Sequence, residues 1–425
     1  MAKQTPKNYR NQVLYSVFVR NYSQEGTFEA VRRDLDRIRD LGVDILWLMP
    51  IHPIGEKSRK GTVGSPYAAK DFRAINPDFG TEEDLKRLVA TAHEKGMKVV
   101  MDIVFNHTAP DSWLAANHPE WFYRKADGSF GNKVGDWYDI IDLDYKQKDL
   151  WTYLIDTLKQ WAAIVDGFRC DASPLIPIEF WQQAREAVET VRPGCIWIGE
   201  TVEPEFIRLL RSCGMIAHSD CESFQVFDMS YEYDSYVVYR RYLHGEIPLS
   251  TYTEAMNWQE SIYPDNYVKL RFLENHDRPR LAQLVRDAKM RRSWTAFLYF
   301  QKGMVMLFNG QEASSAHRPQ LFEKDPVDWT EDEDISAMLR KLYEMKQDPL
   351  FADSAYEVKA LPGDVIFATH TKGEHQILGW FPVKGTCTAV KTDLPDGIHK
   401  NLLGGTVDIY EGSFGLNGEP VILRK

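Results

Sequence analysis

Residues 165–173 read VDGFRCDAS. The run begins with apolar residues typical of a buried strand and continues into a short polar turn. Arg169 and Asp171 lie two positions apart, and because side chains on a strand alternate between faces, both point to the same side. On a strand of a closed parallel barrel, that side is the interior near the mouth. We therefore expect this segment to bring a guanidinium and a carboxylate together at the end of a barrel strand.

Strand-like and helix-like segments alternate on both sides of this run. Thr27 and Gly42 are typical of the start and the end of a helix, and the apolar spacing between them fits one. Eight such alternations predict a closed (β/α)8 TIM barrel. An open doubly wound sheet is disfavoured, because no GxGxxG follows the first strand. The expected strands are residues 13–19, 43–50, 98–105, 165–171, 195–200, 223–229, 268–273 and 304–308.

Two parts of the chain depart from this alternation. Residues 107–147 are rich in Trp, Tyr, Asp, Asn and Gly without a regular period, which predicts a functional loop or a small inserted domain. From about residue 354, short alternating runs separated by Gly and Pro predict an antiparallel β domain. We therefore expect a catalytic barrel over residues 1–106 and 148–350, an inserted domain over 107–147 and a C-terminal β-sandwich over 351–425.

The composition restricts the partners and the compartment. The formal net charge is −11, which argues against nucleic acid or an anionic membrane as partner and suits a neutral substrate. No stretch approaches eighteen consecutive apolar residues, and the first residues hold no apolar signal segment, so we expect a cytoplasmic protein. The five cysteines form no CxxC pair and are expected to be reduced, mostly buried thiols. The sequence indicates no oligomeric state.

Four of the expected strands end in polar side chains. Because the carboxyl ends of barrel strands share one mouth, we expect these side chains to converge. Several carboxylates in one pocket suit glycoside hydrolysis, which needs one acid to protonate the leaving oxygen and one carboxylate to attack the anomeric carbon. The side chains concerned are Asp102, Asn106, His107, Arg169, Asp171, Glu200, Glu274, Asn275, His276 and Asp277.

Two of these carboxylates are expected to differ in pKa. Arg169 next to Asp171 should lower the pKa of Asp171 and keep it ionised. Glu200 follows the apolar run IWIG, with no cation adjacent in sequence, so burial and anionic neighbours should raise its pKa. This difference predicts Asp171 as nucleophile and Glu200 as acid. Taken alone, Arg169 and Asp171 are also compatible with a structural buried ion pair.

Four sequence blocks resemble the conserved blocks of the α-amylase family of retaining glycoside hydrolases, family thirteen, in the same order. They are DIVFNH (102–107), GFRCDAS (167–173), IGET (198–201) and ENHD (274–277). Supporting segments are similar too, and the resemblance covers essentially the whole expected barrel. These segments are GVDILWLMP (42–50), SPYAAKDFRAINPDFGT (65–81), IIDLD (140–144) and FNGQE (308–312).

The resemblance implies a role for each matching residue. Asp171 would be the nucleophile that forms a β-glycosyl enzyme, and Glu200 the general acid and then base. Asp277 would stabilise the oxocarbenium-like transition state. The remaining matches would bind sugar, orient the nucleophile or support the site. In that order they are Tyr67, His107 and His276 for the sugar, Arg169 for Asp171, and Asp102 and Asn106 as structural residues.

The sequence departs from the family pattern at two positions. The family often carries Lys and His three and four residues after the nucleophile, where they contact sugar on the leaving side, whereas this chain has Pro174 and Leu175. Leaving-side binding must therefore use other groups. The chemistry is expected to need no cofactor. The resemblance implies that a structural calcium ion is possible, with Asn106, Asp142 and Asp144 as its candidate ligands.

The block IIDLD, with its acidic last residue, is closer to the α-amylase form than to those of related specificities. We therefore expect a small intracellular-type α-amylase that hydrolyses α-1,4-glucosidic bonds in malto-oligosaccharides or in starch and glycogen dextrins. The alternatives within the family are an exo-acting α-glucosidase, a cyclomaltodextrinase-like enzyme and a transglycosylase. An inactive carbohydrate-binding or scaffold relative is disfavoured, because all three catalytic carboxylates are present.

Overall fold

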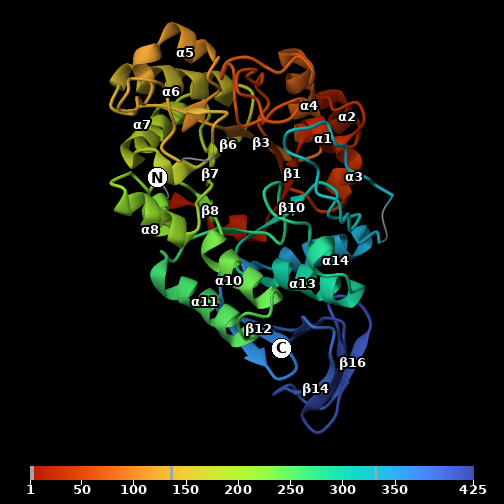
Figure 1. The fold of residues 1–425 in the computed structure, drawn as a ribbon. Coiled ribbons are helices and arrows are strands. Elements are labelled where there is room, and N and C mark those ends of the chain that lie inside the picture. The colour runs from red at the N-terminus through yellow and green to blue at the C-terminus, as the bar shows by residue number, and fades with distance from the viewer. Residues whose placement is uncertain (1–3, 135–136, 331–332) are drawn as a thin grey trace.

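The computed structural model describes residues 4–134, 137–330 and 333–425. The remaining residues, which fall within the predicted barrel and inserted domain, lie outside the described part of the chain. Within it, eight parallel strands close into a barrel, and Figure 1 shows the helices outside this ring. The predicted TIM barrel is therefore confirmed. Around the ring the strands are β1 (Val13–Val17), β2 (Ile45–Leu48), β3 (Lys98–Ile103), β6 (Gly167–Cys170), β7 (Ile196–Gly199), β8 (Met229–Tyr231), β9 (Lys269–Arg271) and β10 (Met304–Phe308).

Helices connect successive strands and cover the barrel. Thr27 caps α2 as predicted, because its side chain accepts a hydrogen bond from Ala30 N. No helix in the described residues is long and apolar enough to cross a membrane. The α-helices are α1 (Val19–Tyr22), α2 (Phe28–Arg33), α3 (Leu35–Asp40), α4 (Glu82–Glu94), α5 (Trp113–Asn117), α6 (Lys148–Ala162), α7 (Ile178–Glu189), α8 (Pro204–Ser212), α9 (Asp220–Ser223), α10 (Tyr233–Leu243), α11 (Leu249–Ile262), α12 (Leu281–Leu284), α13 (Ala288–Phe300) and α14 (Ser336–Lys346), and the 3-10 helices are η2 (Lys7–Asn11), η3 (Pro119–Trp121), η4 (Ser173–Leu175) and η5 (Pro349–Phe351).

The sixth strand was predicted in the wrong place. We expected it over residues 223–229, but β8 begins only at Met229. Ser219 and Glu222 form a capping box that starts helix α9, so the chain turns where a strand was expected. The apolar side chains of Phe224 and Phe227 are buried without belonging to a strand. Apolar content alone therefore did not separate a buried turn from a buried strand.

The prediction that the cysteines are mostly buried was also wrong. All five are free thiols, as expected, but only Cys170 and Cys195 are buried. Cys213, Cys221 and Cys387 are exposed.

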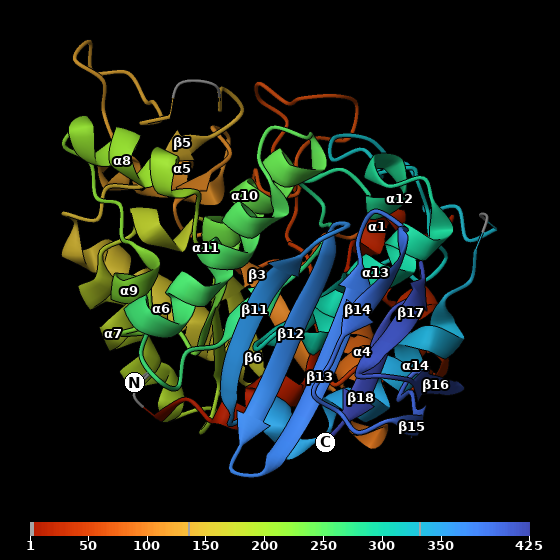
Figure 2. The ribbon, with the colours of Figure 1, turned by 90° about the horizontal axis from the view of Figure 1, so that it is seen from below.

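Two smaller units accompany the barrel. In the insert, β4 (His107–Thr108) pairs with β5 (Ile141–Asp142) in antiparallel register. The C-terminal part is antiparallel, as predicted, with an apolar cluster of its own around Trp380 and Phe414. Figure 2 shows its four-stranded sheet in front of the barrel helices. The strands are β11 (Ala355–Leu361), β12 (Val365–Lys372), β13 (His375–Pro382) and β18 (Val421–Arg424) in that sheet, and the pairs β14 (Cys387–Lys391) with β17 (Ser413–Asn417) and β15 (Gly397–Lys400) with β16 (Thr406–Ile409). The three domain boundaries stay predictions.

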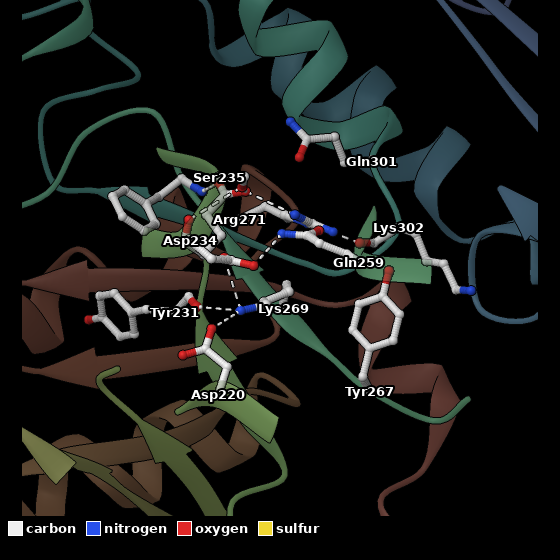
Figure 3. Close-up of polar contacts among 12 residues, drawn as sticks. Asp220, Tyr231, Asp234, Ser235, Gln259, Tyr267, Lys269, Arg271, Gln301 and Lys302 are labelled. Carbon is white, nitrogen blue, oxygen red and sulfur yellow. Dashed lines mark hydrogen bonds and ion pairs between the residues drawn. The ribbon is translucent and has the colours of Figure 1, made fainter. Parts of the chain in front are cut away.

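A buried ion cluster ties strand β9 to the helices outside it. Figure 3 shows the ammonium group of Lys269 between Asp220 of α9 and Asp234 of α10. The Lys269 side chain is fully buried, and its Nζ lies 3.0 Å from Asp234 Oδ1 and 3.1 Å from the Tyr231 carbonyl. Gln259 of α11 donates to the other oxygen of Asp234 (2.9 Å). One cation thus links β8, β9 and helices α9 and α10, and Gln259 adds α11 to the cluster through Asp234.

We predict that Lys269→Met lowers the free energy of unfolding by about 3–5 kcal/mol, because two buried carboxylates would lose their cation. Lys86→Met is the matched control. Its ammonium pairs with Glu82 on an exposed helix surface, so its loss should leave the free energy of unfolding almost unchanged. Guanidinium unfolding followed by circular dichroism measures both variants. A loss below about 1 kcal/mol for Lys269→Met would mean that the cluster does not hold these elements together.

Candidate active site

A cavity of about 380 Å³ lies where the barrel strands end. Tyr67, His107, Asp171, Glu200 and Asp277 line it, and they come from four different strand ends and the loop after β2. Asp102, Asn106, Arg169 and His276 are buried behind this lining. The strand-end residues of the four blocks therefore gather in one place, as the barrel geometry requires.

Arg169 lies at the centre of the buried charges. Its side chain is fully buried, and its Nη1 donates to Asp102 Oδ1 (2.9 Å) and to Asp171 Oδ1 (3.0 Å). Nη2 lies 2.5 Å from Glu200 Oε1, an ion pair without the geometry of a hydrogen bond. We expected this cation to serve Asp171 alone. One guanidinium instead faces three carboxylates.

This sharing makes the prediction for Asp171 wrong. Burial raises the pKa of Asp171 to about 6, and the attraction of Arg169 only partly offsets it. Burial also raises the pKa of Glu200 to about 7, again against Arg169 and with help from Asp171 and Asp277. The upward shift predicted for Glu200 has the right direction, although a cation does lie beside it. Asp171 remains the stronger acid of the two, so the order of the pair is as expected.

Asp277 is more acidic than Asp171 and Glu200. Loss of water contact to the surrounding protein would raise its pKa, but its side chain is still 43% exposed, and His276, whose Nε2 lies 3.2 Å from Asp277 Oδ2, lowers the pKa to about 2. Asp277 in turn raises the pKa of His276 above its ordinary value, against the effect of burial. The Tyr67 hydroxyl lies 2.8 Å from His276 Nε2, and the two rings stack. Asp277 therefore stays anionic at any pH near neutrality.

The supporting residues lie as predicted near strand β3. Both oxygens of Asp102 accept from Arg169, and Oδ2 also lies 3.2 Å from the Tyr67 hydroxyl. Asn106 Nδ2 lies 3.1 Å from His107 Nδ1. Burial lowers the pKa of His107, so its imidazole is neutral and can both donate and accept a hydrogen bond. The Trp137 ring packs at an angle to His107 (5.9 Å between centroids).

Two further strand-end residues, Glu274 and Asn275, do not line the cavity either. Glu274 accepts from Arg280 Nη1 (2.7 Å) and from Leu281 N (2.6 Å), which start helix α12. Asn275 Nδ2 donates to the Tyr233 hydroxyl (3.1 Å). The expectation that every polar residue after these strands converges was therefore too broad.

The described side chains do not form a carboxylate cage around the proposed calcium ligands. Asp142 accepts from Lys133 N (2.7 Å) with one oxygen, and its other oxygen is buried without a hydrogen bond. Asp144 accepts from Lys146 N (3.1 Å). Among the described residues, no three His, Cys, Asp or Glu side chains gather into a metal site. Calcium takes six to eight oxygens, so one orphaned oxygen falls short, and calcium stays a prediction.

Several lining residues were missed by the sequence reasoning. Ala172 has a left-handed backbone (φ 43°), and its N–H donates to Glu200 Oε2 (3.0 Å), so the residue after the nucleophile positions the acid. No sequence signal marks this conformation in a non-glycine residue. Beside Glu200, part of the cavity wall is apolar, and Leu175 stands there at the position where the family often carries His. The apolar part consists of Leu175, Val202 and Phe206.

Arg278 and Glu203 form an ion pair at the cavity, and both are about 29% exposed. Arg278 directly follows the ENHD block and Glu203 lies three residues after Glu200, so proximity to the blocks could have indicated them.

The comparisons with known proteins agree with this geometry. The model of the alpha-amylase catalytic domain matches residues 12–140 and 116–352, and that of the bacterial alpha-amylase C-terminal domain matches residues 357–423. The crystal structure of an alpha-amylase from Lactobacillus plantarum is 44% identical, with a TM-score of 0.97 over 99% of this chain and 100% of that one. The crystal structure of a noncanonic maltogenic alpha-amylase, AmyB from Thermotoga neapolitana, is 32% identical, with a TM-score of 0.86 over 98% and 99%.

The curated relatives are longer proteins. Alpha-amylase MalA from Haloarcula japonica is 26% identical over 84% of this chain, which spans 52% of that relative. An alpha-1,4-glucan:maltose-1-phosphate maltosyltransferase from Rhodospirillum rubrum is 32% identical over 59% of this chain, which matches 36% of it. The chain thus spans about a third to a half of the length of these relatives.

The pKa values of the central pair predict a narrow bell-shaped pH profile of kcat/KM on maltoheptaose. Activity should rise as Asp171 ionises near pH 6 and fall as Glu200 loses its proton near pH 7, because the nucleophile must be ionised and the acid protonated. The two limbs belong to the coupled pair rather than to single groups. Circular dichroism across the same range controls for unfolding. A flat profile from about pH 5 to pH 9 would contradict the assignment.

Proposed function

The chain belongs to the alpha-amylase family, and we propose that it hydrolyses α-1,4-glucosidic bonds in malto-oligosaccharides or in starch and glycogen dextrins. The observation that supports this most directly is the pair of carboxyl groups, Asp171 and Glu200, that Arg169 holds at the cavity. Asp277 completes the set from another strand end of the same cavity.

The spacing of the pair favours a retaining mechanism. Both carboxyl groups contact the same guanidinium: Asp171 Oδ1 lies 3.0 Å from Nη1 of Arg169, and Glu200 Oε1 lies 2.5 Å from Nη2, so a single planar group spans the pair. Inverting enzymes keep their carboxyl groups about 6.5–9.5 Å apart to admit that water, and retaining enzymes about 5–5.5 Å. The close pair therefore supports a covalent intermediate.

The reaction proceeds in two displacements. An oxygen of Asp171 attacks the anomeric carbon while Glu200 gives its proton to the glycosidic oxygen, so the bond to the leaving sugar breaks and a β-glycosyl aspartate forms. Glu200, now ionised, takes a proton from water, whose oxygen attacks the same carbon. The bond to Asp171 breaks, the sugar leaves as the α-anomer, and both groups return to their starting states.

The remaining residues act on the sugar in both steps. Asp277 is held anionic by His276, so a fixed negative charge faces the positive charge that develops on the ring. His107 offers hydrogen bonds and Tyr67 offers a ring surface for stacking, while His276, behind the lining, holds Asp277 and Tyr67 in place. A transglycosylase would use the same groups with a sugar acceptor in place of water, and an exo-acting α-glucosidase or a cyclomaltodextrinase-like enzyme would differ only in subsites. An inactive relative is disfavoured, because all three carboxylates are present at the cavity.

The other functional expectations stay proposals. We keep a cytoplasmic location, an α-glucan as the partner, and chemistry that needs no cofactor. Calcium at Asn106, Asp142 and Asp144 has no step of the reaction assigned to it.

We predict that Asp171→Asn and Glu200→Gln each lower turnover of maltoheptaose at least about a thousandfold, because each removes a group that makes or breaks a bond. Both replacements are nearly isosteric, so the melting temperature should change little. Glu274→Gln is the matched control. Glu274 is also buried after a strand but bonds Arg280 away from the cavity, so this change should affect stability more than turnover. Retention of more than about a tenth of activity in both site variants would contradict the roles of nucleophile and acid.

We also predict that the first product is the α-anomer, because two displacements at one carbon restore its configuration. Proton NMR within the first minutes of maltoheptaose hydrolysis, before mutarotation, measures the anomer directly. Initial β-product would indicate a single displacement by water.

A further inference from the structure

We infer that the cavity is closed on the side away from Glu200 by three loops held together by Lys60, so that the enzyme acts on the non-reducing ends of α-glucans and releases short products. This inference rests on the function proposed above. It concerns which part of a glucan chain the site accepts, which neither the blocks nor the relatives decide.

The barrel order fixes which loops lie opposite the acid. Around the ring, β7 faces β1, and β2 and β10 flank β1. Glu200 follows β7, so the loops after β2 and β10 rise on the far side of the cavity. Figure 2 shows these two loops, in red-orange and in teal, on the same side of the barrel, together with loops of the insert.

The two loops are bonded to each other. The N–H groups of Val63 and Gly64 both donate to the carbonyl oxygen of Phe322 (3.1 Å each). Thr62 N donates to Glu323 Oε1 (2.9 Å). The loop after β2 therefore meets the loop after β10 through backbone as well as side-chain contacts.

Lys60 joins the insert to these two loops. Its Nζ lies 2.8 Å from Asp139 Oδ1, and the two side chains are only 18% and 7% exposed. The ammonium group also faces the Tyr138 ring at 4.6 Å and the Phe322 ring at 5.7 Å. Lys60, Asp139 and Phe322 all line the cavity. One cation therefore makes an ion pair and two cation–π contacts at the place where three segments meet.

The reaction chemistry determines which end of the glucan chain lies towards this wall. Glu200 protonates the oxygen that joins the sugar to its leaving group, so the leaving part of the chain lies on the Glu200 side, along the apolar wall of Leu175, Val202 and Phe206. The part that keeps the non-reducing end extends the other way, towards Lys60. A cavity of about 380 Å³ is near the lower end of the usual range for ligand sites, about 300–1,000 Å³. A chain segment with glucose units on both sides would have to displace the contacts of Lys60 with Asp139 and Phe322 to pass the wall.

Two substrates of equal length test this inference. They are p-nitrophenyl α-maltoheptaoside with a free non-reducing end and the same compound with that end blocked by a 4,6-O-ethylidene group. The blocked end does not fit against the wall, so we expect the wild type to cleave it at least about 50-fold more slowly. Chromatography should show that the nitrophenyl products from the free substrate are shortened by one fixed, small number of glucose units.

Lys60→Ala should open the wall. We expect cleavage of the blocked substrate to rise at least about tenfold relative to the free one, and the products to spread in length. Phe322→Ala should open the wall in the same way. Lys60→Arg should keep the wild-type pattern, because it retains the cation. Lys70→Ala is the matched control, since Lys70 lies on the same loop, pairs with Glu56 at the surface and does not line the cavity.

Each outcome has one meaning. Equal cleavage of both substrates by the wild type would overturn the closed wall. An unchanged ratio in folded Lys60→Ala and Phe322→Ala would overturn the part assigned to Lys60. Cleavage of neither substrate by the wild type would instead refute the proposed function, so the two failures are distinguishable.

Discussion

The buried guanidinium of Arg169 is the interaction on which the site depends. Three carboxylates surround it at the bottom of the cavity, and a single positive charge cannot balance them. An unpaired charge is costly in such a place, so the cluster retains protons that exposed acids would release. Burial, together with repulsion between the carboxylates, raises the pKa of Asp171 to about 6 and that of Glu200 to about 7, against the attraction of Arg169. Glu200 can therefore hold its proton near neutral pH without a further group that serves only to raise its pKa.

Asp277 shows the opposite solution to the same problem. It has its own partner in His276, whose Nε2 lies 3.2 Å from Asp277 Oδ2. The result is a carboxylate whose pKa falls to about 2 at a site where burial alone would raise it. The cavity thus combines Asp277, which stays charged, with Asp171 and Glu200, which share the single cation of Arg169. This division of roles follows from the number of cations near each carboxylate.

The same physical rule separates supporting ions from reactive ones. Lys269 is as buried as Arg169, but it faces two carboxylates and a carbonyl outside the barrel, where it joins strands to helices. Lys60 is partly exposed and joins loops at the rim. Each of these cations stabilises whatever elements its partners belong to, and the partners of Arg169 are the ones that face the reacting sugar. Position relative to the strand ends therefore decides whether an ion pair supports the fold or the chemistry.

The sequence by itself determined the barrel and the four strand-end blocks, because apolar runs and strand alternation are local properties that survive without coordinates, but it determined only part of the cavity lining. It misplaced the sixth strand, since a capping box can turn a buried apolar segment that reads as a strand. It also assigned Arg169 to Asp171 alone, because adjacency in sequence was the only proximity available to it. Only the tertiary structure showed that Asp102 and Glu200 share that guanidinium, that the left-handed backbone at Ala172 aims an N–H at the acid, and that Lys60 meets Asp139 across two loops. Charges act through space rather than along the chain, so pKa values and the shape of the cavity are decided by residues that are distant in sequence.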